Sequence, residues 1–284
     1  MYRRPGGLTK LFYHAIVWAM IAFAVFPVVW IALASLNPSN SLYTSGIPKK
    51  IVWDHYVELF SNPHHPFGLW LWNSVKVAGI SSLFIVFLSA LAAYAFSRFR
   101  FWGRRTGLLA LLLIQMFPQM LAMVALYLLL LNLGRYIPWL GLNTHAGLIL
   151  VYLGGALGFN TWLMKGYFDT IPHELEESAL IDGATPFQAF VRIILPLARP
   201  ILAVVYILSF IGIYSEFILA SILLTGTKAY TFPVGLRLFI TGQYSTRWGT
   251  FAAASILGAI PIMLVFLSLQ RFLVSGLTRG AVKG

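Results

Sequence analysis

Six stretches of the chain are long and almost entirely apolar, and shorter polar segments separate them. A hydrocarbon core about 30 Å thick is crossed by roughly 20 residues of α-helix, and each stretch meets or approaches that length. Pro27, Pro118 and Pro261 are tolerable inside them, because neighbouring helices in a membrane satisfy the freed carbonyls. We therefore predict an all-α membrane protein with six transmembrane helices. They are expected at residues 11–36, 75–96, 107–131, 146–164, 201–224 and 250–273.

Polar residues interrupt two of the predicted helices. Gln115 and Pro118 break the apolar pattern of the third stretch, and Glu216 breaks that of the fifth. A long polar loop at 37–69 follows the first stretch, and we expect it to carry a short helix near residues 55–61. Two shorter connections are expected on the same side of the membrane, at 132–145 and 225–249.

The composition agrees with lipid surroundings. Of the 284 residues, 59% are hydrophobic and only 10% are charged, against about 45–50% and about 25% in soluble domains. The net charge of +12 does not indicate nucleic-acid binding, because the basic residues lie between apolar stretches rather than among aromatics on a soluble face. The absence of cysteine excludes disulfides, thiolate metal sites and cysteine nucleophiles.

The basic residues also predict the orientation, since cytoplasmic loops carry an excess of Lys and Arg. With both termini in the cytoplasm, 13 basic residues fall on that side and 6 on the other, while Lys76 ends the second helix. The cytoplasmic set is Arg3, Arg4, Lys10, Arg98, Arg100, Arg104, Arg105, Lys165, Arg192, Arg199, Arg271, Arg279 and Lys283. The external set is Lys49, Lys50, Arg135, Lys228, Arg237 and Arg247.

The first apolar stretch has a second interpretation. Arg3 and Arg4 form a basic start, and the sequence from Ala32 to Ala34 resembles a signal-peptide cleavage site. The stretch is longer than the roughly 7–15 apolar residues of a signal peptide. An uncleaved membrane anchor is therefore favoured.

The segment from Tyr167 to Pro200 is unusually acidic. It cannot lie in hydrocarbon, yet its local signals predict order. Pro172 at a first helical position, followed by acids that complement the helix dipole, predicts a helix over 172–182, and Gly183 is typical of the residue after a helix end. Five of the eight acidic residues lie here: Asp169, Glu174, Glu176, Glu177 and Asp182.

A second short helix is predicted directly after Gly183. Thr185 as N-cap, Pro186 at the first position and Gln188 three residues after the cap match the capping-box pattern. The bent hairpin has two open interpretations, a docking site for a soluble partner or an amphipathic elbow on the membrane surface. Glutamates beside an anionic leaflet disfavour the elbow for the first helix. Apolar residues on one face of the second are Phe187, Phe190, Ile193 and Ile194.

This hairpin resembles the EAA loop of binding-protein-dependent ABC import permeases. The matching residues are Glu177, Ser178, Ala179, Asp182, Gly183, Ala184, Phe190 and Pro196, with Ser178 in place of an alanine of the motif. Further stretches are similar to the G-type permease subunit of maltose and maltodextrin importers, although the first external loop is different and shorter. They lie at 70–79, 136–138, 141–145, 166–168 and 276–284.

The resemblance implies a type I ABC importer permease that pairs with a second, non-identical permease around the path for maltose, maltodextrin or trehalose. Two ATPase subunits using ATP and Mg²⁺ would bind below, and an external sugar-binding protein would dock above. The hairpin 172–196 would be the coupling helix, docking on the ATPase through the eight matching residues. Leu277, Thr278 and Lys283 of the tail would also contact the ATPase. Gly242, Gln243 and Tyr244 would contact the binding protein.

The resemblance further implies a multi-pass protein of a bacterial or archaeal cytoplasmic membrane. It divides the chain into an N-terminal helix and loop (1–69), a permease core (70–275) and a cytoplasmic tail (276–284). The sequence lacks a G-x-x-x-x-G-K-[ST] phosphate loop, so we expect no enzyme and no bound cofactor, with ATP hydrolysed by the partner. An ion-gradient-driven secondary transporter and a membrane scaffold without a path are the rivals, and a membrane enzyme has the least support.

Polar residues within the predicted helices have open interpretations. Glu216, the one acid expected inside a membrane helix, either lines a path or gate or binds backbone amides at a helix break. Four other polar residues either face the sugar path or join neighbouring helices by hydrogen bonds. These are Asn73, Gln115, Asn160 and Thr161. Asn160 is the one of them that we name as a candidate path or gate residue.

Four tryptophans near the predicted helix ends are expected at the membrane interface rather than stacked on sugar rings. Lys76 is expected to extend toward the outer surface. The six histidines show no metal-ligand pairing, and we predict no metal site. The tryptophans are Trp70, Trp72, Trp139 and Trp248.

Overall fold

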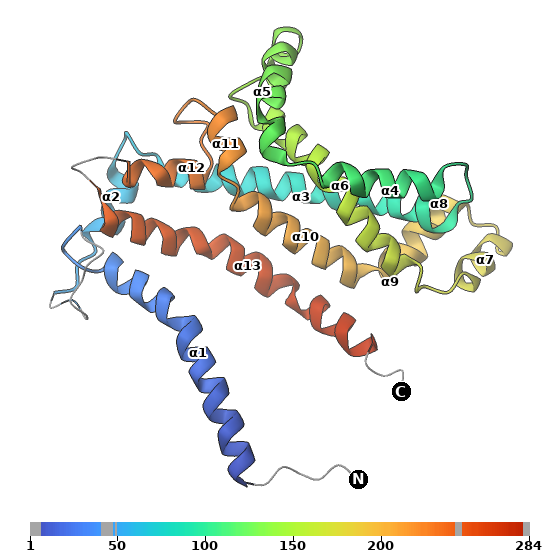
Figure 1. Cartoon of the computed structure of the whole chain (residues 1–284), viewed down its shortest axis with the longest axis horizontal. Coiled ribbons are helices and arrows are strands. Elements are labelled where there is room, and N and C mark those ends of the chain that lie inside the picture. The colour runs from blue at the N-terminus through green and yellow to red at the C-terminus, as the bar shows by residue number, and fades with distance from the viewer. Residues whose placement is uncertain (1–6, 41–47, 49, 242–245, 281–284) are drawn as a thin grey trace. The chain divides into compact units, whose positions relative to one another are not determined.

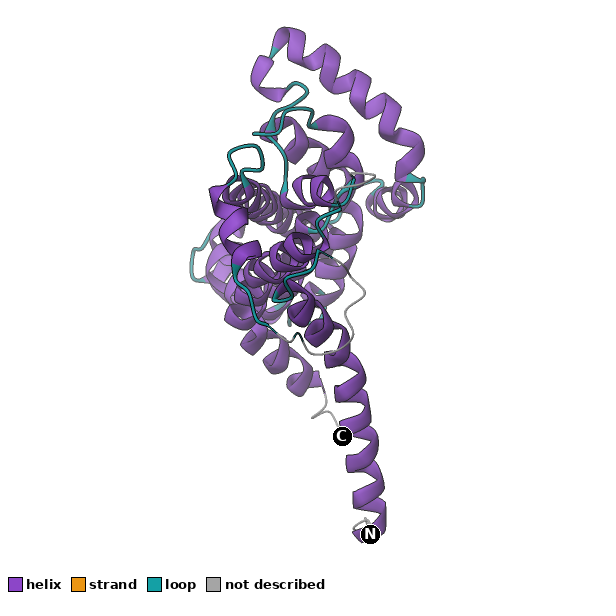
Figure 2. Cartoon of the chain, turned by 90° about the vertical axis from the view of Figure 1, so that its left-hand side faces the viewer, coloured by secondary structure: helices purple, strands orange, loops and turns teal. Residues whose placement is uncertain are grey.

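The computed structural model describes residues 7–40, 48, 50–241 and 246–280, without the side chains of residues 119 and 273–280. Helices and their connections make up this described part, and no strand occurs in it (Figure 1, Figure 2). The elements are α1 (Gly7–Ser35), α2 (Asp54–Ser61), α3 (Phe67–Arg98), α4 (Arg104–Gln115), α5 (Gln119–Tyr136), η1 (Pro138–Leu140), α6 (His145–Phe168), α7 (Glu174–Ile181), α8 (Pro186–Ala189), η2 (Phe190–Ile194), α9 (Leu195–Leu197), α10 (Arg199–Tyr214), α11 (Ile218–Leu223), α12 (Phe232–Leu236), η3 (Arg237–Phe239) and α13 (Trp248–Gly280).

The number of membrane spans agrees with the prediction. Among the described residues, the helices α1, α3, α6 and α13 are each long and apolar enough to cross a membrane. Two bent pairs pass the same test, α4 with α5 and the segment Pro186–Leu197 with α10. The total reaches six if each bent pair is one span.

The third predicted span differs from a single interrupted helix. The helices α4 and α5 meet at an angle of 97°, and α5 turns away from the line of α4 in Figure 1. Pro118 precedes α5 with an extended backbone, and its ring and missing N–H prevent a continuous helix there. The predicted break at Glu216 is confirmed, because α10 ends at Tyr214 and α11 begins at Ile218. The short helix of the first loop is confirmed as α2.

Contacts divide the chain into two compact units. The first comprises Met1–Gly68 and Leu236–Ala259, and the second comprises Leu69–Gly235 and Ile260–Gly284.

In the first unit, α2 is bonded to two other segments. The Ser35 and Tyr56 hydroxyls lie 2.8 Å apart, which joins α2 to the end of α1. Glu58 accepts a hydrogen bond from the Thr250 hydroxyl at 2.9 Å and pairs with Arg247, which joins α2 to the start of α13. Most of α1 is exposed, and none of its most apolar window is buried, as expected of a helix that faces lipid.

The core of the second unit lies between α3, α6, the η2 segment and α10. These helices contribute large side chains that are almost fully buried, and such packing, rather than exclusion of water, holds helices together in a membrane. The central residues are Ile85, Met164, Phe168, Ile194 and Val205.

At the other end of this unit, one side chain satisfies the backbone that follows α11. The side-chain oxygen Oδ1 of Asn143 accepts hydrogen bonds from the N–H groups of Thr225 at 3.0 Å and Gly226 at 2.9 Å. The N–H of Asn143 donates to the Leu223 carbonyl at 2.8 Å. Asn143 has φ 60°, a conformation that asparagine adopts more readily than most residues.

Side chains from the first turns of α3 hydrogen-bond to the loop that follows α11, at residues 227–230. The Trp70 indole donates to the Thr227 carbonyl at 2.7 Å. The Asn73 amide donates to the carbonyls of Lys228 at 3.0 Å and Tyr230 at 2.9 Å. Trp70 is 0% exposed, so the prediction that its ring faces the membrane interface is wrong: the ring is buried within the protein, and its N–H binds the Thr227 carbonyl. Asn73 thus joins α3 to the loop that follows α11.

Gly158 allows α4 to approach α6 closely. A Cβ atom added at Gly158 would lie 2.4 Å from the Leu111 carbonyl oxygen, whereas one added at Gly154, one turn earlier on α6, meets no described atom within 4 Å. Small residues at such positions let membrane helices pack backbone to backbone.

We predict opposite effects from the same substitution at these two glycines. Gly158→Ala should force α4 away and lower the thermal stability of the purified protein, by about 1–3 kcal/mol as for overpacking. Gly154→Ala should leave it unchanged or raise it slightly, since alanine favours a helix by up to about 1 kcal/mol over glycine. Thermal unfolding in detergent measures both, and a stable Gly158→Ala protein would contradict the close approach.

Candidate coupling site

The bend of the acidic hairpin is fixed by local hydrogen bonds. The N–H of Ala184 donates to the Ala179 carbonyl at 2.9 Å, and that of Gly183 donates to the Leu180 carbonyl at 3.1 Å. This pair is the Schellman pattern that ends helices at a left-handed residue, and Gly183 has φ 88°. The predicted helix end at Gly183 is confirmed. The helix starts at Glu174 rather than at Pro172, with His173 at the N-cap position.

The predicted start of the second helix is confirmed in full. Thr185 accepts a hydrogen bond from the Gln188 N–H, the Gln188 side chain accepts one from the Thr185 N–H, and Pro186 occupies the first turn. From α8 the chain continues through η2 and α9 to α10. The η2 segment is a π-helix, in which the Leu195 N–H donates to the Phe190 carbonyl. The segment Pro186–Leu197 meets α10 at an angle of 76° at Ala198, so the hairpin is joined to α10 through a bent helical connection.

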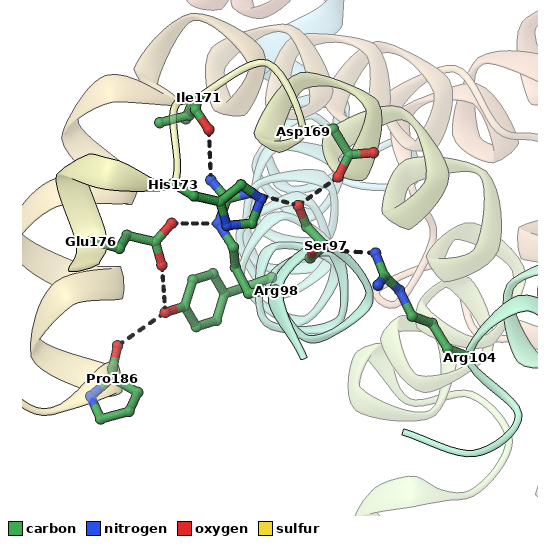
Figure 3. A network of polar contacts seen from close by, with 9 residues as sticks. Ser97, Arg98, Arg104, Asp169, Ile171, His173, Glu176 and Pro186 are labelled. Carbon is green, nitrogen blue, oxygen red and sulfur yellow. Dashed lines mark hydrogen bonds and ion pairs between the residues drawn. The ribbon is translucent and has the colours of Figure 1, made fainter. Parts of the chain in front are cut away.

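A buried ion pair fixes the hairpin to the end of α3 (Figure 3). Arg98 pairs with Glu176, and the two side chains are only 5% and 9% exposed. The other oxygen of Glu176 accepts a hydrogen bond from the Tyr94 hydroxyl at 2.9 Å, which lies 3.2 Å from the Pro186 carbonyl. Arg98 also donates to the Ile171 carbonyl at 3.0 Å. We call the set Tyr94, Arg98 and Glu176 the α3–hairpin anchor.

A second polar link lies beside the α3–hairpin anchor, at the end of α6. Asp169 accepts hydrogen bonds from Ser97 at 2.6 Å and Lys165 at 2.5 Å. Burial acts to raise the pKa of Asp169, but the Lys165 and Ser97 hydrogen bonds and the charges of Lys165 and Arg104 hold that pKa below its ordinary value. The carboxylate therefore stabilises the fold at neutral pH, and this contribution is lost as the pH falls through the folded-state pKa.

The residues matched to the EAA motif divide by exposure. Glu177, Ser178, Asp182, Gly183 and Pro196 are exposed, and Ala179 and Ala184 are partly buried. Phe190 is instead 2% exposed, and its ring centroid lies 4.7 Å from that of Tyr94. Phe190 therefore packs the hairpin against α3.

Two large apolar side chains are exposed close to these acids. Ile181 is 87% exposed and Phe187 is 65% exposed. Carboxylates beside exposed apolar groups form a surface of mixed chemistry, which suits contact with another protein. Glu176, by contrast, faces inward, so the adjacent Glu176 and Glu177 have separate roles.

Glu216 satisfies the backbone at the break between α10 and α11. Its carboxylate accepts hydrogen bonds from the N–H groups of Leu219 at 2.7 Å and Ala220 at 3.0 Å, and from the Tyr152 hydroxyl at 2.6 Å. Of the two interpretations left open for Glu216, the geometry supports helix capping. Asn160 is 9% exposed and donates to the Ala156 carbonyl of its own helix at 2.8 Å.

Several predicted contact residues fall where the structure gives no side-chain description. Gly242, Gln243, Tyr244 and Lys283 lie outside the described residues. Leu277 and Thr278 lie in the last turns of α13, but their side chains are outside the described part of the chain.

Sequence reasoning missed Tyr94, Ser97 and Arg98 as parts of the site. Arg98 had been assigned only to membrane orientation, and Tyr94 and Ser97 lie in or near an apolar run. One signal was available. A tyrosine, a serine and an arginine within five residues at the end of a predicted membrane helix have polar groups that need partners if buried, and five of the eight acids of the chain lie in the segment 167–200.

Comparison with known proteins agrees with this arrangement. The family described as "Binding-protein-dependent transport system inner membrane component" matches residues 85–279. The chain belongs to this family. Its members are inner-membrane components by that description, so the chain is a multi-pass inner-membrane protein, and the family match sets aside the secondary-transporter interpretation.

Close relatives within this family share nearly the whole length. The chain is 49% identical to "Maltose/maltodextrin transport system permease protein MalG" of Escherichia coli strain K12 over 282 residues, 95% of each chain. The protein of the same name from Salmonella typhimurium strain LT2 is 49% identical over 288 residues, 98% of this chain and 97% of that protein.

A solved structure supports the type I permease fold. A chain from the crystal structure of a bacterial ABC transporter that imports the acidic polysaccharide alginate matches with a TM-score of 0.74. It is 23% identical in sequence and covers 95% of this chain and 98% of its own length.

We predict that the two adjacent glutamates respond differently to neutralisation. Glu176→Gln leaves Arg98 as an unpaired buried charge and should destabilise the hairpin by about 3–5 kcal/mol. Glu177→Gln removes an equal charge from an exposed position and should have little effect. Hydrogen–deuterium exchange over residues 171–190 measures the difference, and equal exchange rates in the two variants would rule out the α3–hairpin anchor.

Proposed function

We propose that this chain is a permease subunit of an ATP-driven sugar importer. It would form, with a second and non-identical permease, the path for maltose, maltodextrin or a related oligosaccharide such as trehalose. The observation that carries the proposal is the 49% identity, over 95% of both chains, to proteins named maltose/maltodextrin transport system permease. The membership in a binding-protein-dependent family supports an external sugar-binding protein as a further partner.

The energy for transport would come from a partner ATPase dimer that binds ATP and Mg²⁺. This chain has no phosphate-loop motif in its sequence, which supports a transport subunit rather than an enzyme. The excess of basic residues on one side supports cytoplasmic termini and a cytoplasmic hairpin, where such an ATPase would dock.

The docking surface would be the exposed side of the hairpin, with Glu177, Ser178, Asp182 and Gly183 at its centre. A movement imposed there by the ATPase has two routes into the membrane helices, and the second passes through the bend at Ala198. The α3–hairpin anchor links the hairpin to α3, and the helical backbone of η2 and α9 links it to α10. Rigid-body movement of this kind is a common means of switching between conformations.

The remaining contacts follow the same assignment. Leu277, Thr278 and Lys283 of the tail would add to the ATPase interface, and Gly242, Gln243 and Tyr244 would contact the sugar-binding protein. Asn160 and Glu216 remain candidates for the path or gate. For Glu216 we favour an indirect role, in which the cap on α11 shapes the path wall.

The test of the function is reconstitution of the complex. The tagged chain should co-purify with a second permease and an ATPase. Proteoliposomes holding this complex should take up radiolabelled maltose only with the binding protein outside and Mg-ATP inside. ADP should not support uptake, and ionophores should not abolish it. Uptake by the chain alone, driven by an ion gradient, would overturn the proposal, and a scaffold role would be indicated if the second permease transported alone.

The docking role of the hairpin has a sharper test at Gly183. No described atom lies within 4 Å of a Cβ built there, so only the positive φ opposes a side chain. Gly183→Val should strain the bend by about 1–3 kcal/mol and reduce both ATPase retention and uptake several-fold. Gly183→Asn should retain most of both, because asparagine tolerates this conformation. Unchanged uptake and ATPase retention in Gly183→Val would contradict the docking assignment.

A further inference from the structure

A basic pocket with no role in the proposed coupling lies where α3 ends and α4 begins. It has a volume of about 550 Å³ and is lined by Phe101, Arg104, Arg105 and Lys165, among others. Small-molecule sites occupy about 300–1,000 Å³. The pocket is therefore large enough for a ligand, and its lining predicts an anion.

The charges of the pocket are only partly compensated within the chain. Lys165 pairs with Asp169, and Arg104 donates to the neutral carbonyls of Phe96 and Ser97. The exposed Arg105 has no ion pair or hydrogen bond in the part of the chain that the structure describes. Of the three cations that line the pocket, Lys165 is thus the one with an ion pair among the described residues.

Exposed aromatic residues of the same turn are consistent with a pocket at the membrane–water interface. Trp102 is 100% exposed, and Phe99 and Phe101 are each 46% exposed. Aromatic side chains next to cations are typical of a membrane–water interface. Leu109 and Leu113 on α4 are 52% and 64% exposed, so an apolar surface leads away from the pocket along the helix.

We infer that this pocket binds the phosphate headgroup of an anionic phospholipid, with an acyl chain lying along α4. Basic pockets between helices on the cytoplasmic side are suited to such headgroups. The exposed apolar surface beside the cations favours a lipid over free phosphate, because free phosphate has no apolar group that could cover this surface. The inference does not depend on the transported sugar or on the ATPase.

The test compares two neighbouring arginines in the purified full-length chain. Native mass spectrometry in detergent would follow titration with dioleoyl phosphatidylglycerol and, separately, dioleoyl phosphatidylcholine. Arg105→Gln should weaken phosphatidylglycerol binding about fivefold, as removal of one cation near a membrane surface implies. Arg105→Lys should retain binding. Arg100→Gln is the matched control, because Arg100 is also exposed in the same turn but does not line the pocket.

Each other outcome would overturn the inference. An equal loss in the Arg100 and Arg105 variants would indicate unspecific attraction between charges, and equal binding of phosphatidylcholine would exclude recognition of an anion. Displacement of the lipid by inorganic phosphate at matched ionic strength would identify free phosphate as the ligand. Thermal unfolding of the Arg105 variants should match that of the unmodified chain, which separates loss of binding from loss of fold.

Discussion

The ion pair between Arg98 and Glu176 is the contact on which the position of the hairpin depends. The hairpin is short, and helices of about eight residues are unstable alone in water. Its order comes from a carboxylate shared between Arg98 and Tyr94 and from Phe190 packed behind them. A buried ion pair is weak evidence for added stability, but each partner leaves a costly unpaired charge if the other moves away. The main effect of the ion pair is therefore to fix the position of the hairpin against the end of α3.

Local chemistry explains the parts of the fold that the sequence predicted well. The apolar stretches, the bend at Gly183 and the Thr185 capping box each depend on residues within a few positions of one another. So does the break at Glu216, where the acid reaches amides three and four residues ahead. The family resemblance added the expectation that the hairpin docks on an ATPase, whereas spacing alone left docking and a surface elbow open.

The features that were missed depend on contacts between distant segments. Arg98 and Glu176 are separated by 78 positions, and the Trp70 indole finds its acceptor 157 positions away. The aromatic-belt rule assigns Trp70 to the interface, and the positive-inside rule uses Arg98 as a marker of orientation. Both rules consider a residue's place along the chain and not the distant residue to which it hydrogen-bonds. Phe190 likewise fits a motif that suggests an outward role, whereas its burial follows from the packing of α3 against the hairpin. Proline predicted a break at Pro118 but not a turn of 97°.

The π-helix at Phe190–Ile194 has a consequence for insertions and deletions. A π-turn holds one residue more than the α-turn it replaces. Loss of a single residue here would convert it to an ordinary turn and leave the helix downstream in phase. The same deletion in α10 would rotate the later side chains of that helix by roughly 100°, the angle per residue of an α-helix. This short segment is thus the place where the length of the connection can vary while α10 keeps its buried face.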